Sequence, residues 1–387
     1  MREAVIVDAL RTPVGKRNGQ LKGWHPVDLL AETLKALVVR NNLDPMLVED
    51  VIAGCVMQAG EQAYNVGRNA VLAAGFPEEV PGTTIDRQCG SSQQAAHFAA
   101  QAVLAGANDI VIACGVENMS RVPMGSSGQG PGKPFGPAMY KRYDNNLPHQ
   151  GIGAEMIAKK WGISRQQLDA FSVESHRRAA YAQTEGRFDS QIIPITVKDE
   201  EGNTSQFTKD EGIRPNTSLE ILANLKPAFS PDGSITAGNS SQISDGAAAL
   251  LIMERKVAES LGLKPRFRFV SFAVVGADPV MMLTGPIPAT KKTLAKAGMT
   301  LDQMDVIEIN EAFASVVLAW QKEYDDDLSR VNINGGAVAL GHPLGASGAR
   351  LMTTMLYELE RSGGRFGFQT MCEGGGMANG TIIERLD

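Results

Sequence analysis

Three residues that lie far apart in the chain are of types that carry out nucleophilic and acid–base chemistry, and the first is Cys89. It lies in Asp86-Arg-Gln-Cys-Gly-Ser-Ser, directly before an alanine-rich segment that we expect to be helical. A cysteine at a helix start faces free backbone N–H groups and the positive end of the helix dipole, which favour the attacking thiolate. Because free cysteines are most often small buried hydrophobes, the competing interpretation is a core residue.

The other two candidates, His342 and Cys372, each lie in a glycine-rich segment. His342 lies in Asn334-Gly-Gly-Ala-Val-Ala-Leu-Gly-His-Pro-Leu-Gly-Ala-Ser-Gly, which predicts a rigid loop where backbone approaches a ligand. This loop lacks the lysine of a nucleotide phosphate loop. Cys372 ends an expected strand and precedes Glu373-Gly-Gly-Gly, whose N–H groups could stabilise an oxyanion. The alternatives are a structural histidine and a second core cysteine.

The remaining cysteines and histidines lack such surroundings. Cys55 and Cys114 end apolar strands and are interpreted as packing residues, while His97 and His176 fall within expected helices and are interpreted as structural or solvated. The chain has no Cys-x-x-Cys, Gly-x-Ser-x-Gly or His-Glu-x-x-His, and no Gly-x-Gly-x-x-Gly opens it. A metal site, a disulfide framework, a serine hydrolase and a dehydrogenase therefore lack support.

The composition is that of a globular protein of 387 residues, 43% hydrophobic and 21% charged. Its net charge of -6 argues against a nucleic-acid surface. The chain opens directly on a strand-like pattern, and no stretch approaches the roughly 20 apolar residues that a membrane helix needs. We therefore expect a cytoplasmic protein without membrane insertion, since widely spaced cysteines suit a reducing compartment.

Short β-branched runs alternate with alanine- and leucine-rich stretches, which predicts an α/β fold with sheets covered on both faces. The expected strands are Ala4–Val7, Asp50–Ala53, Asp109–Ala113, Asp305–Ile309 and Gly367–Met371. The expected helices are Pro26–Val39, Ser91–Ala105, Ile152–Trp161, Arg165–Glu185, Pro288–Ala297 and Ala346–Glu360.

An internal echo indicates a duplicated domain. Asp50-Val-Ile-Ala-Gly leads to Cys89 after 39 positions, and Asp305-Val-Ile-Glu-Ile leads to His342 after 37. A helix and then a strand follow each candidate. Two such copies would present their helix-start and strand-end loops to a shared interface, where α/β folds bind ligands.

The stretch between the copies differs in character. It has clusters of glycine, proline and serine and a polar, hairpin-like segment at Lys198–Asp210, before a buried strand pattern returns at Asp245–Met253. Long insertions of this kind usually carry function. We expect an N-terminal half at 1–117, completed by about 244–264, a loop domain at 118–243, and a C-terminal half at 265–387.

Together these segments resemble the thiolase family along essentially the whole chain. The matching segments are Arg11-Thr-Pro-Val-Gly, Cys89-Gly-Ser-Ser, Ala237-Gly-Asn-Ser-Ser, Asp245-Gly-Ala-Ala-Ala, Asn310-Glu-Ala-Phe, Gly341-His-Pro-Leu-Gly-Ala-Ser-Gly and Cys372-Glu-Gly-Gly-Gly. The resemblance implies two βαβαβαββ halves in a five-layered αβαβα thiolase fold, with an inserted loop domain that binds CoA. It also implies a homodimer or homotetramer, acyl-CoA substrates, coenzyme A as co-substrate, and no tightly bound cofactor.

The resemblance also assigns roles to the candidates. Cys89 would attack the 3-oxo carbon of a 3-oxoacyl-CoA after giving its proton to His342, and Cys372 would protonate the departing enolate. One oxyanion site would be formed by His342 and a water held by Asn310. The other would use the backbone N–H groups of Cys89 and Gly374.

Contacts with CoA and the acyl group are carried over in the same way. Ser241 would lie near the pantetheine, and Arg214 and Thr217 near the nucleotide end. The remaining substrate contacts would be His149, Gln150, Phe229, Met282, Ala312 and Phe313. For Arg214 the alternative is a solvated side chain, and for Phe229 and Met282 it is a place in the core.

Two positions depart from the short-chain biosynthetic thiolases, which usually have methionine where this chain has Gln150 and an apolar residue where it has Glu373. The segments Gly15-Lys-Arg-Asn-Gly and Ser240-Ser-Gln-Ile-Ser-Asp are similar to those of thiolases that shorten bulky or steroid side-chain CoA esters. A biosynthetic acetoacetyl-CoA thiolase stays an alternative. A decarboxylating ketoacyl synthase is disfavoured by Cys372, and a non-catalytic lipid or sterol carrier by the retention of all the candidate catalytic residues.

Overall fold

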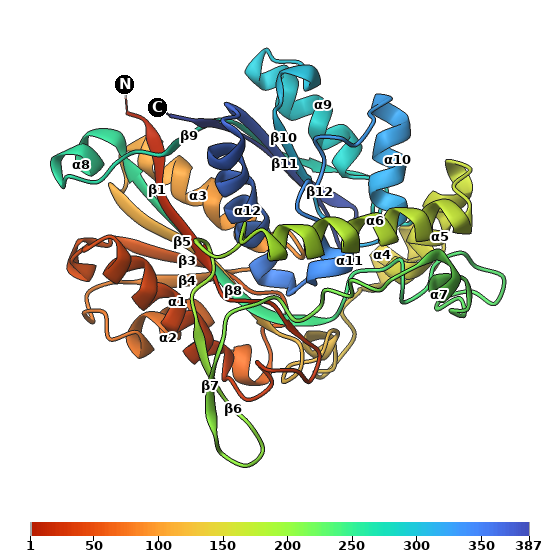
Figure 1. Ribbon diagram of the computed structural model, residues 1–387, viewed down its shortest axis with the longest axis horizontal. Helices are drawn as coiled ribbons and strands as arrows, with labels where there is room; N and C mark the ends of the chain where they lie inside the picture. The colour runs from red at the N-terminus through yellow and green to blue at the C-terminus, as the bar shows by residue number, and fades with distance from the viewer. Residues whose placement is uncertain (1, 387) are drawn as a thin grey trace.

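The computed structural model describes residues 2–386, which form a layered α/β structure (Figure 1). The strands are β1 (Ala4–Arg11), β2 (Gly15–Lys16), β3 (Asp50–Gly54), β4 (Gly82–Ile85), β5 (Ile110–Asn118), β6 (Ile195–Lys198), β7 (Thr204–Phe207), β8 (Ser244–Glu254), β9 (Phe267–Gly276), β10 (Val306–Ile309), β11 (Phe366–Glu373) and β12 (Met377–Arg385). The helices are α1 (Pro26–Arg40), α2 (Val66–Ala73), α3 (Ser91–Ala105), α4 (Pro137–Arg142), α5 (Gln150–Lys160), α6 (Arg165–Thr184), α7 (Leu219–Ala223), α8 (Arg255–Ser260), α9 (Pro286–Ala297), α10 (Ala314–Tyr324), α11 (Ala337–Leu340) and α12 (Ser347–Ser362).

The strand order shows that the two halves of the chain are copies of one plan. In the first half β4, β3 and β5 are parallel neighbours, and β8 and β1 follow antiparallel. In the second half, a parallel bridge at Val331 lies beside β10, and β10 and β11 are parallel neighbours. Strands β12 and β9 follow in the sheet, each antiparallel to the strand before it. A short pairing of β1 with β9 joins the halves. The duplication expected from the sequence is therefore confirmed.

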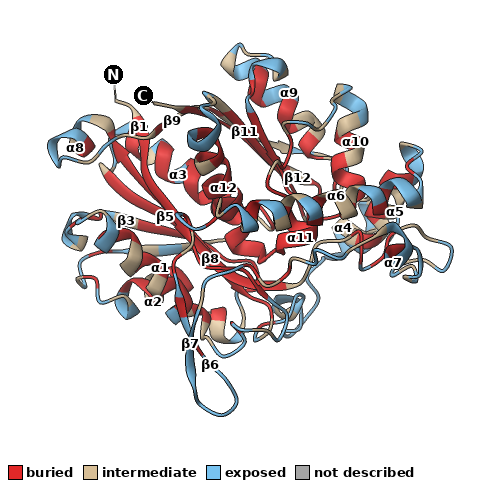
Figure 2. Cartoon of the chain, viewed as in Figure 1, coloured by how far each residue is buried: buried red, intermediate tan, exposed pale blue. Residues whose placement is uncertain are grey.

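Helices and strands alternate in five layers. Helices α3 and α12 lie against each other between the two halves of the sheet, and Figure 2 shows that both are largely buried. Helices α1 and α2 cover the outer face of the first half, and α9 covers that of the second, with α10 beside it (Figure 1). This arrangement confirms the αβαβα architecture.

The close approach of the two central helices depends on glycine. A side-chain carbon at Gly348, on the first turn of α12, would overlap with the backbone of Gln93 on α3. One at Gly345 would overlap with the backbone of Cys55 and Gly54. The glycine-rich motif after His342 therefore lets the second half of the chain touch the segment that begins with Cys89.

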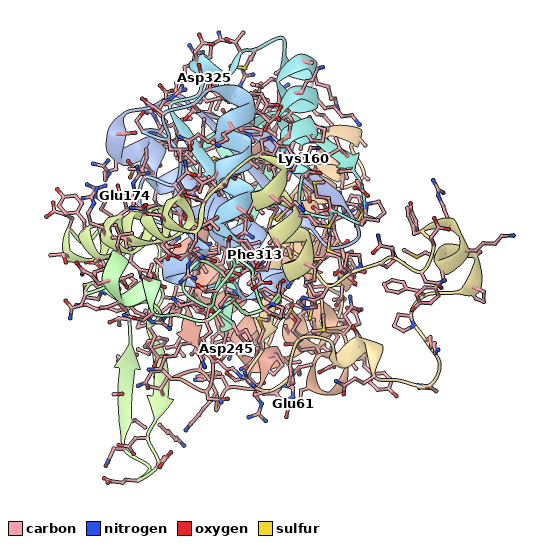
Figure 3. The ribbon with its side chains drawn as sticks, turned by 90° about the vertical axis from the view of Figure 1, so that its right-hand side faces the viewer. Glu61, Lys160, Glu174, Asp245, Phe313 and Asp325 are labelled. Carbon is pink, nitrogen blue, oxygen red and sulfur yellow. The ribbon has the colours of Figure 1, made fainter. Side chains whose placement is uncertain are left out.

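The insertion between β5 and β8 carries α4 to α7 and the hairpin of β6 and β7. Figures 1 and 3 show this hairpin extending from the body, and Figure 3 shows the segment with α4 projecting on another side. Helices α5 and α6 pack on α10, and α6 also packs on α11. A buried ion pair between Arg11 on β1 and Asp210, with Nη1 to Oδ1 at 2.7 Å, ties the insertion to the first half. Of the helices within the described residues, none has the length and apolar character to cross a membrane.

The expected elements all form, most of them with ends shifted by one or more residues. The largest differences are β1, which continues to Arg11, and β5, which continues to Asn118. The hairpin expected at Lys198–Asp210 is formed by Ile195–Lys198 and Thr204–Phe207. The expectations omitted the strands β2, β4, β9 and β12 and the helices α2, α4, α7, α8, α10 and α11.

Candidate active site

Cys89 lies in the turn between β4 and α3, one residue before the N-cap of the helix. Its neighbour Gln88 has a left-handed backbone with φ of 49°. Cys89 is 8% exposed, and the backbone N–H groups of Cys89 itself and of Gly374 lower the pKa of its thiol. The two backbone donors that the resemblance assigned therefore lie near the candidate nucleophile.

The protonation state of Cys89 is set by burial more than by the helix start. The pKa of its thiol is raised to about 12, mainly by burial and next by the charge of the nearby Glu373, and the two N–H groups offset only part of this increase. Desolvation of a charged sulfur outweighs the favourable dipole. The helix start therefore does not keep Cys89 ionised, and the thiol needs a base, the role that the resemblance gives to His342, to become a nucleophile.

His342 is oriented as such a base. Its Nδ1 lies 2.5 Å from Ser347 Oγ, and that hydroxyl donates its one hydrogen to Pro343 O at 2.8 Å. Ser347 must then accept from Nδ1–H, so that Nε2 carries a lone pair and no hydrogen. Burial, followed by the charge of Arg350, lowers the pKa of His342 to about 3, so the ring is neutral. A neutral imidazole with a free Nε2 can accept a proton.

Asn310 completes the surroundings of this imidazole. Its Nδ2 lies 3.3 Å from His342 Nε2, and its Oδ1 is buried without a hydrogen-bond partner among the described residues. Asn310 follows β10 directly, and its backbone N–H donates to Thr370 O on β11 at 3.1 Å. The side chain is therefore held at the strand ends, with an unused acceptor beside the base.

The loop that carries His342 is fixed to both halves of the chain. The His342 backbone N–H donates to Gln242 O at 3.1 Å, at the end of the insertion. The Glu117 carboxylate on β5 accepts from the backbone N–H groups of Gly345 and Val56, each at 2.9 Å, and from that of Met57 at 3.0 Å. A buried carboxylate with three backbone donors thus fixes the loop to the first half.

Cys372 lies at the end of β11, opposite Ala378 on β12, and is fully buried. It packs in a cluster with Ala312 and Phe313. Burial raises the pKa of its thiol well above the usual value, and the charge of Cys89 raises it further. The structure therefore brings Cys372, like His342, Asn310 and Gly374, into the neighbourhood of Cys89.

A cavity of about 250 Å³ opens beside Cys89 and His342. It is also lined by the predicted residues His149, Gln150, Phe229, Ser241, Ala312 and Phe313. The Phe229 ring stacks on His149 with centroids 5.5 Å apart and meets Phe313 edge-on at 5.9 Å. The three rings therefore line one side of the cavity that contains Cys89 and His342. Figure 3 labels Phe313 near the centre of the molecule.

Three predicted contacts lie outside the lining of this cavity. Arg214 is exposed, and its backbone N–H donates to His176 Nδ1 at 3.0 Å. Thr217 Oγ1 donates to Arg214 O at 2.8 Å, so both belong to one turn of the insertion. Met282, with φ of 61°, packs against the cluster that contains Cys372. A larger cavity of about 340 Å³ lies between α6 and α10 and has neither cysteine nor histidine in its lining.

The sequence interpretation missed several residues of the site. Further residues of the cavity lining are Met119, Met124, Ser240, Gln242, Ile243 and Leu344. Ser347 lies in the quoted motif five positions after His342, and a hydroxyl at a helix start beside a histidine is a usable signal. Glu117 ends an apolar strand pattern, where a buried acid is unexpected. The methionines carry no signal that separates them from core residues.

Comparison with known proteins agrees with this geometry. The family model described as "Thiolase, N-terminal domain" matches residues 4–256, and that described as "Thiolase, C-terminal domain" matches residues 263–385. The chain is 52% identical over 394 residues to a steroid 3-ketoacyl-CoA thiolase, FadA6, of Mycobacterium tuberculosis, covering 100% of this chain and 95% of that protein. It is 46% identical to a 3-ketoacyl-CoA thiolase of Aliivibrio fischeri over the full length of both.

Among solved structures, the Bacillus anthracis acetyl-CoA acetyltransferase superposes with a TM-score of 0.91 at 40% identity, covering 100% of this chain and 99% of the other. The chain belongs to the thiolase family. It is an acyltransferase with thiolase activity.

Proposed function

We propose that this thiolase cleaves a 3-oxoacyl-CoA with CoA, giving acetyl-CoA and a shortened acyl-CoA, or runs the reverse condensation, through an acyl group on Cys89. The observation that carries this proposal is the cavity shared by Cys89 and His342. A buried thiol with donors aimed at its sulfur and a neutral imidazole with a free Nε2 are the parts that covalent acyl transfer needs.

In the first half-reaction the Cys89 thiol passes its proton to His342 Nε2, and its sulfur attacks the 3-oxo carbon. The new oxyanion accepts hydrogen bonds from the N–H groups of Cys89 and Gly374, which already face the sulfur. The bond between C2 and C3 then breaks, and its electron pair moves onto C2 of the leaving acetyl-CoA enolate. Cys372 gives its proton to C2 and becomes a thiolate.

In the second half-reaction the Cys372 thiolate takes the proton of the incoming CoA thiol. The CoA sulfur attacks the acyl-Cys89 thioester, and Cys89 leaves and recovers its proton from His342. The protonated His342 and a water held by Asn310 stabilise the enolate oxygen of the first half-reaction. Every proton returns to its donor over the cycle, and the thioester itself acidifies the α-carbon, so the proposed steps use no metal and no bound cofactor. Condensation is the same sequence in reverse, with Cys372 abstracting the α-proton of acetyl-CoA.

The insertion supplies the CoA site in this proposal. Residues 118–243 form the loop domain, between an N-terminal half at 1–117 with 244–264 and a C-terminal half at 265–387. Ser241 contacts the pantetheine within the cavity, and Met282 lies along the same channel. Arg214 and Thr217 meet the nucleotide end outside it, which suits a cavity of about 250 Å³ that is too small for the whole of CoA. The enzyme acts as a homodimer or homotetramer in the cytoplasm.

The identity of the acyl group is a second part of the proposal. The chain is 52% identical to a protein named as a steroid 3-ketoacyl-CoA thiolase, which supports a bulky or steroid-derived ester. Its likeness to an acetyl-CoA acetyltransferase structure supports acetoacetyl-CoA as the competing substrate. In the cavity, Gln150 is held by a contact of its Nε2 with Met124 Sδ at 3.6 Å, and this pair borders the space for the acyl group.

The test is an assay of 3-oxoacyl-CoA esters of graded length, with one steroid-derived ester, in which CoA-dependent loss of the enolate absorbance is followed. Cys89→Ala should abolish turnover of every ester while CoA still binds. Cys114→Ala is the matched control, because Cys114 is also a fully buried thiol but lies in the core of the first half. Turnover by Cys89→Ala would overturn the covalent proposal, and no turnover of any ester by the parent enzyme would favour a carrier.

A further inference from the structure

Glu373 is a buried acid beside the nucleophile that the proposed mechanism does not use. It lies between Cys372 and Gly374, at the end of β11, and is fully buried. Neither of its carboxyl oxygens meets a donor in hydrogen-bond geometry among the described residues. A carboxylate buried in this way would be costly, so the state of this group has to be explained.

A second unpartnered acceptor shares its surroundings. Asn379 Oδ1, on β12, is also buried without a partner. A side-chain carbon at Gly90 would overlap with both Glu373 Oε1 and Asn379 Oδ1, so both oxygens lie against the same backbone atom at the start of α3. Asn379 Nδ2 points the other way and donates to Gln94 Oε1 at 3.2 Å. Both oxygens are hydrogen-bond acceptors and lie close together. They can form a hydrogen bond with each other only if one of them carries a proton.

We infer that Glu373 is kept as a neutral carboxylic acid whose O–H donates to Asn379 Oδ1, and that it acts as a positioning residue for acyl transfer at Cys89. This bond would satisfy both orphaned oxygens. It would also connect the ends of β11 and β12 across the glycine turn that carries Gly374. The backbone N–H of Gly374 would then be fixed beside the Cys89 sulfur. The inference rests on the proposed function, because the position of Gly374 matters only if an oxyanion forms there.

The charges around Glu373 agree with this state. The pKa of Glu373 is raised to about 9, mainly by burial; Arg87 and the Asn379 backbone N–H oppose this increase, and Asp86 adds to it. Arg87 Nη1 is also 3.7 Å from Met377 Sδ on β12. A negative Glu373 would in turn raise the pKa of both Cys89 and Cys372. Ionisation would therefore break the bond to Asn379 and oppose both the thiolate and the oxyanion.

The inference predicts a pH dependence of definite sign. The pKa of this acid is raised, so the neutral form is present at neutral pH and is lost as the pH rises through about 9. The rate of acyl transfer should fall over that range. If Glu373 instead acted as an ionised carboxylate, the rate of acyl transfer would rise as the pH increased through its pKa.

The experiment compares kcat and kcat/KM for acetoacetyl-CoA thiolysis between pH 7 and pH 10 in the parent enzyme and three variants. Glu373→Gln should keep activity within about threefold at pH 7, because its amide can donate to Asn379, and should lose the decline near pH 9. Glu373→Leu, which has no donor, should lose about tenfold or more in kcat. Glu308→Gln is the control, since Glu308 is another buried acid, with its pKa raised to about 8, and its removal should leave the decline in place.

Two results would overturn the inference. One is a Glu373→Gln variant as inactive at pH 7 as Glu373→Leu while both remain folded by circular dichroism. The other is an unchanged alkaline decline in Glu373→Gln. Mass spectrometry of acyl-Cys89 in the parent enzyme distinguishes these failures from failure of the proposed function, because the latter would leave Cys89 unmodified in every sample.

Discussion

Replacing Ser347 with alanine should slow acyl transfer by removing the group that fixes the tautomer of His342. Ser347 Oγ is the acceptor for the Nδ1–H at 2.5 Å, and the site is fully buried. Without this hydroxyl the Nδ1–H has no acceptor. The other tautomer, with its hydrogen on Nε2, is then populated as well, and its Nε2 cannot accept the proton of Cys89. Leaving a buried donor unsatisfied costs about 1–3 kcal/mol.

That energy converts directly into a rate. Each 1.36 kcal/mol corresponds to a factor of about ten, so kcat/KM should fall about 5- to 150-fold. The loss should appear in kcat rather than in KM, because the CoA contacts are untouched. The assay is acetoacetyl-CoA thiolysis at saturating CoA, with the acyl-enzyme measured in a single turnover to isolate the first half-reaction.

A matched control comes from the same helix. Thr353 is buried and its Oγ1 donates to Ala349 O at 2.8 Å, as Ser347 donates to Pro343 O, but it has no histidine partner. Thr353→Val should therefore lose the same kind of helical hydrogen bond without a loss of rate. Equal rate losses in the two variants, or a fully active Ser347→Ala, would refute the tautomer argument.

Three further outcomes follow from the same geometry. Cys372→Ala should abolish carbon–carbon bond cleavage while acetyl exchange at the nucleophile is partly retained, and equal complete loss of both would contradict a separate proton carrier. Gly348→Ala should lower the free energy of unfolding by about 1–3 kcal/mol, because its methyl group meets backbone of α3, whereas Gly23→Ala, which meets nothing within 4 Å, should be near neutral by chemical denaturation. Asp210→Asn should cost about 3–5 kcal/mol of stability because it leaves the fully buried Arg11 guanidinium without its counter-charge, and a thermal midpoint unchanged from the parent would contradict that role.

Much of the fold could be predicted because its signals are local or repeated. The β-branched runs indicated the buried strands. The sequence pattern that begins at Asp50 and is repeated from Asp305 predicted the duplication that the strand order confirms. Strand β9 was missed because it is only half-buried and its polar residues interrupt the apolar run. Strand β12 was missed because it begins directly after three glycines, where a sequence pattern suggests only a turn.

The candidate site was predictable at the level of residue types and not of their states. Motifs pointed to Cys89 and His342, which the structure places in one cavity. The size of the increase in the Cys89 pKa could not be predicted, since it depends on burial that only the packed structure reveals. The partners Arg11 and Asp210 lie 199 positions apart, and no pattern in the chain links them. The role inferred for Glu373 likewise depends on a contact across two strands and a helix start.

The proposed mechanism requires that one sulfur accept the acyl group, and trapping the acyl-enzyme is a direct test of this requirement. The protein would be incubated with acetyl-CoA, quenched in acid and digested, and its cysteine peptides measured by mass spectrometry. We expect one acetyl group per chain, on Cys89, and none on Cys372, Cys55 or Cys114. Acetylation of another residue, or turnover without any acylated Cys89, would contradict it.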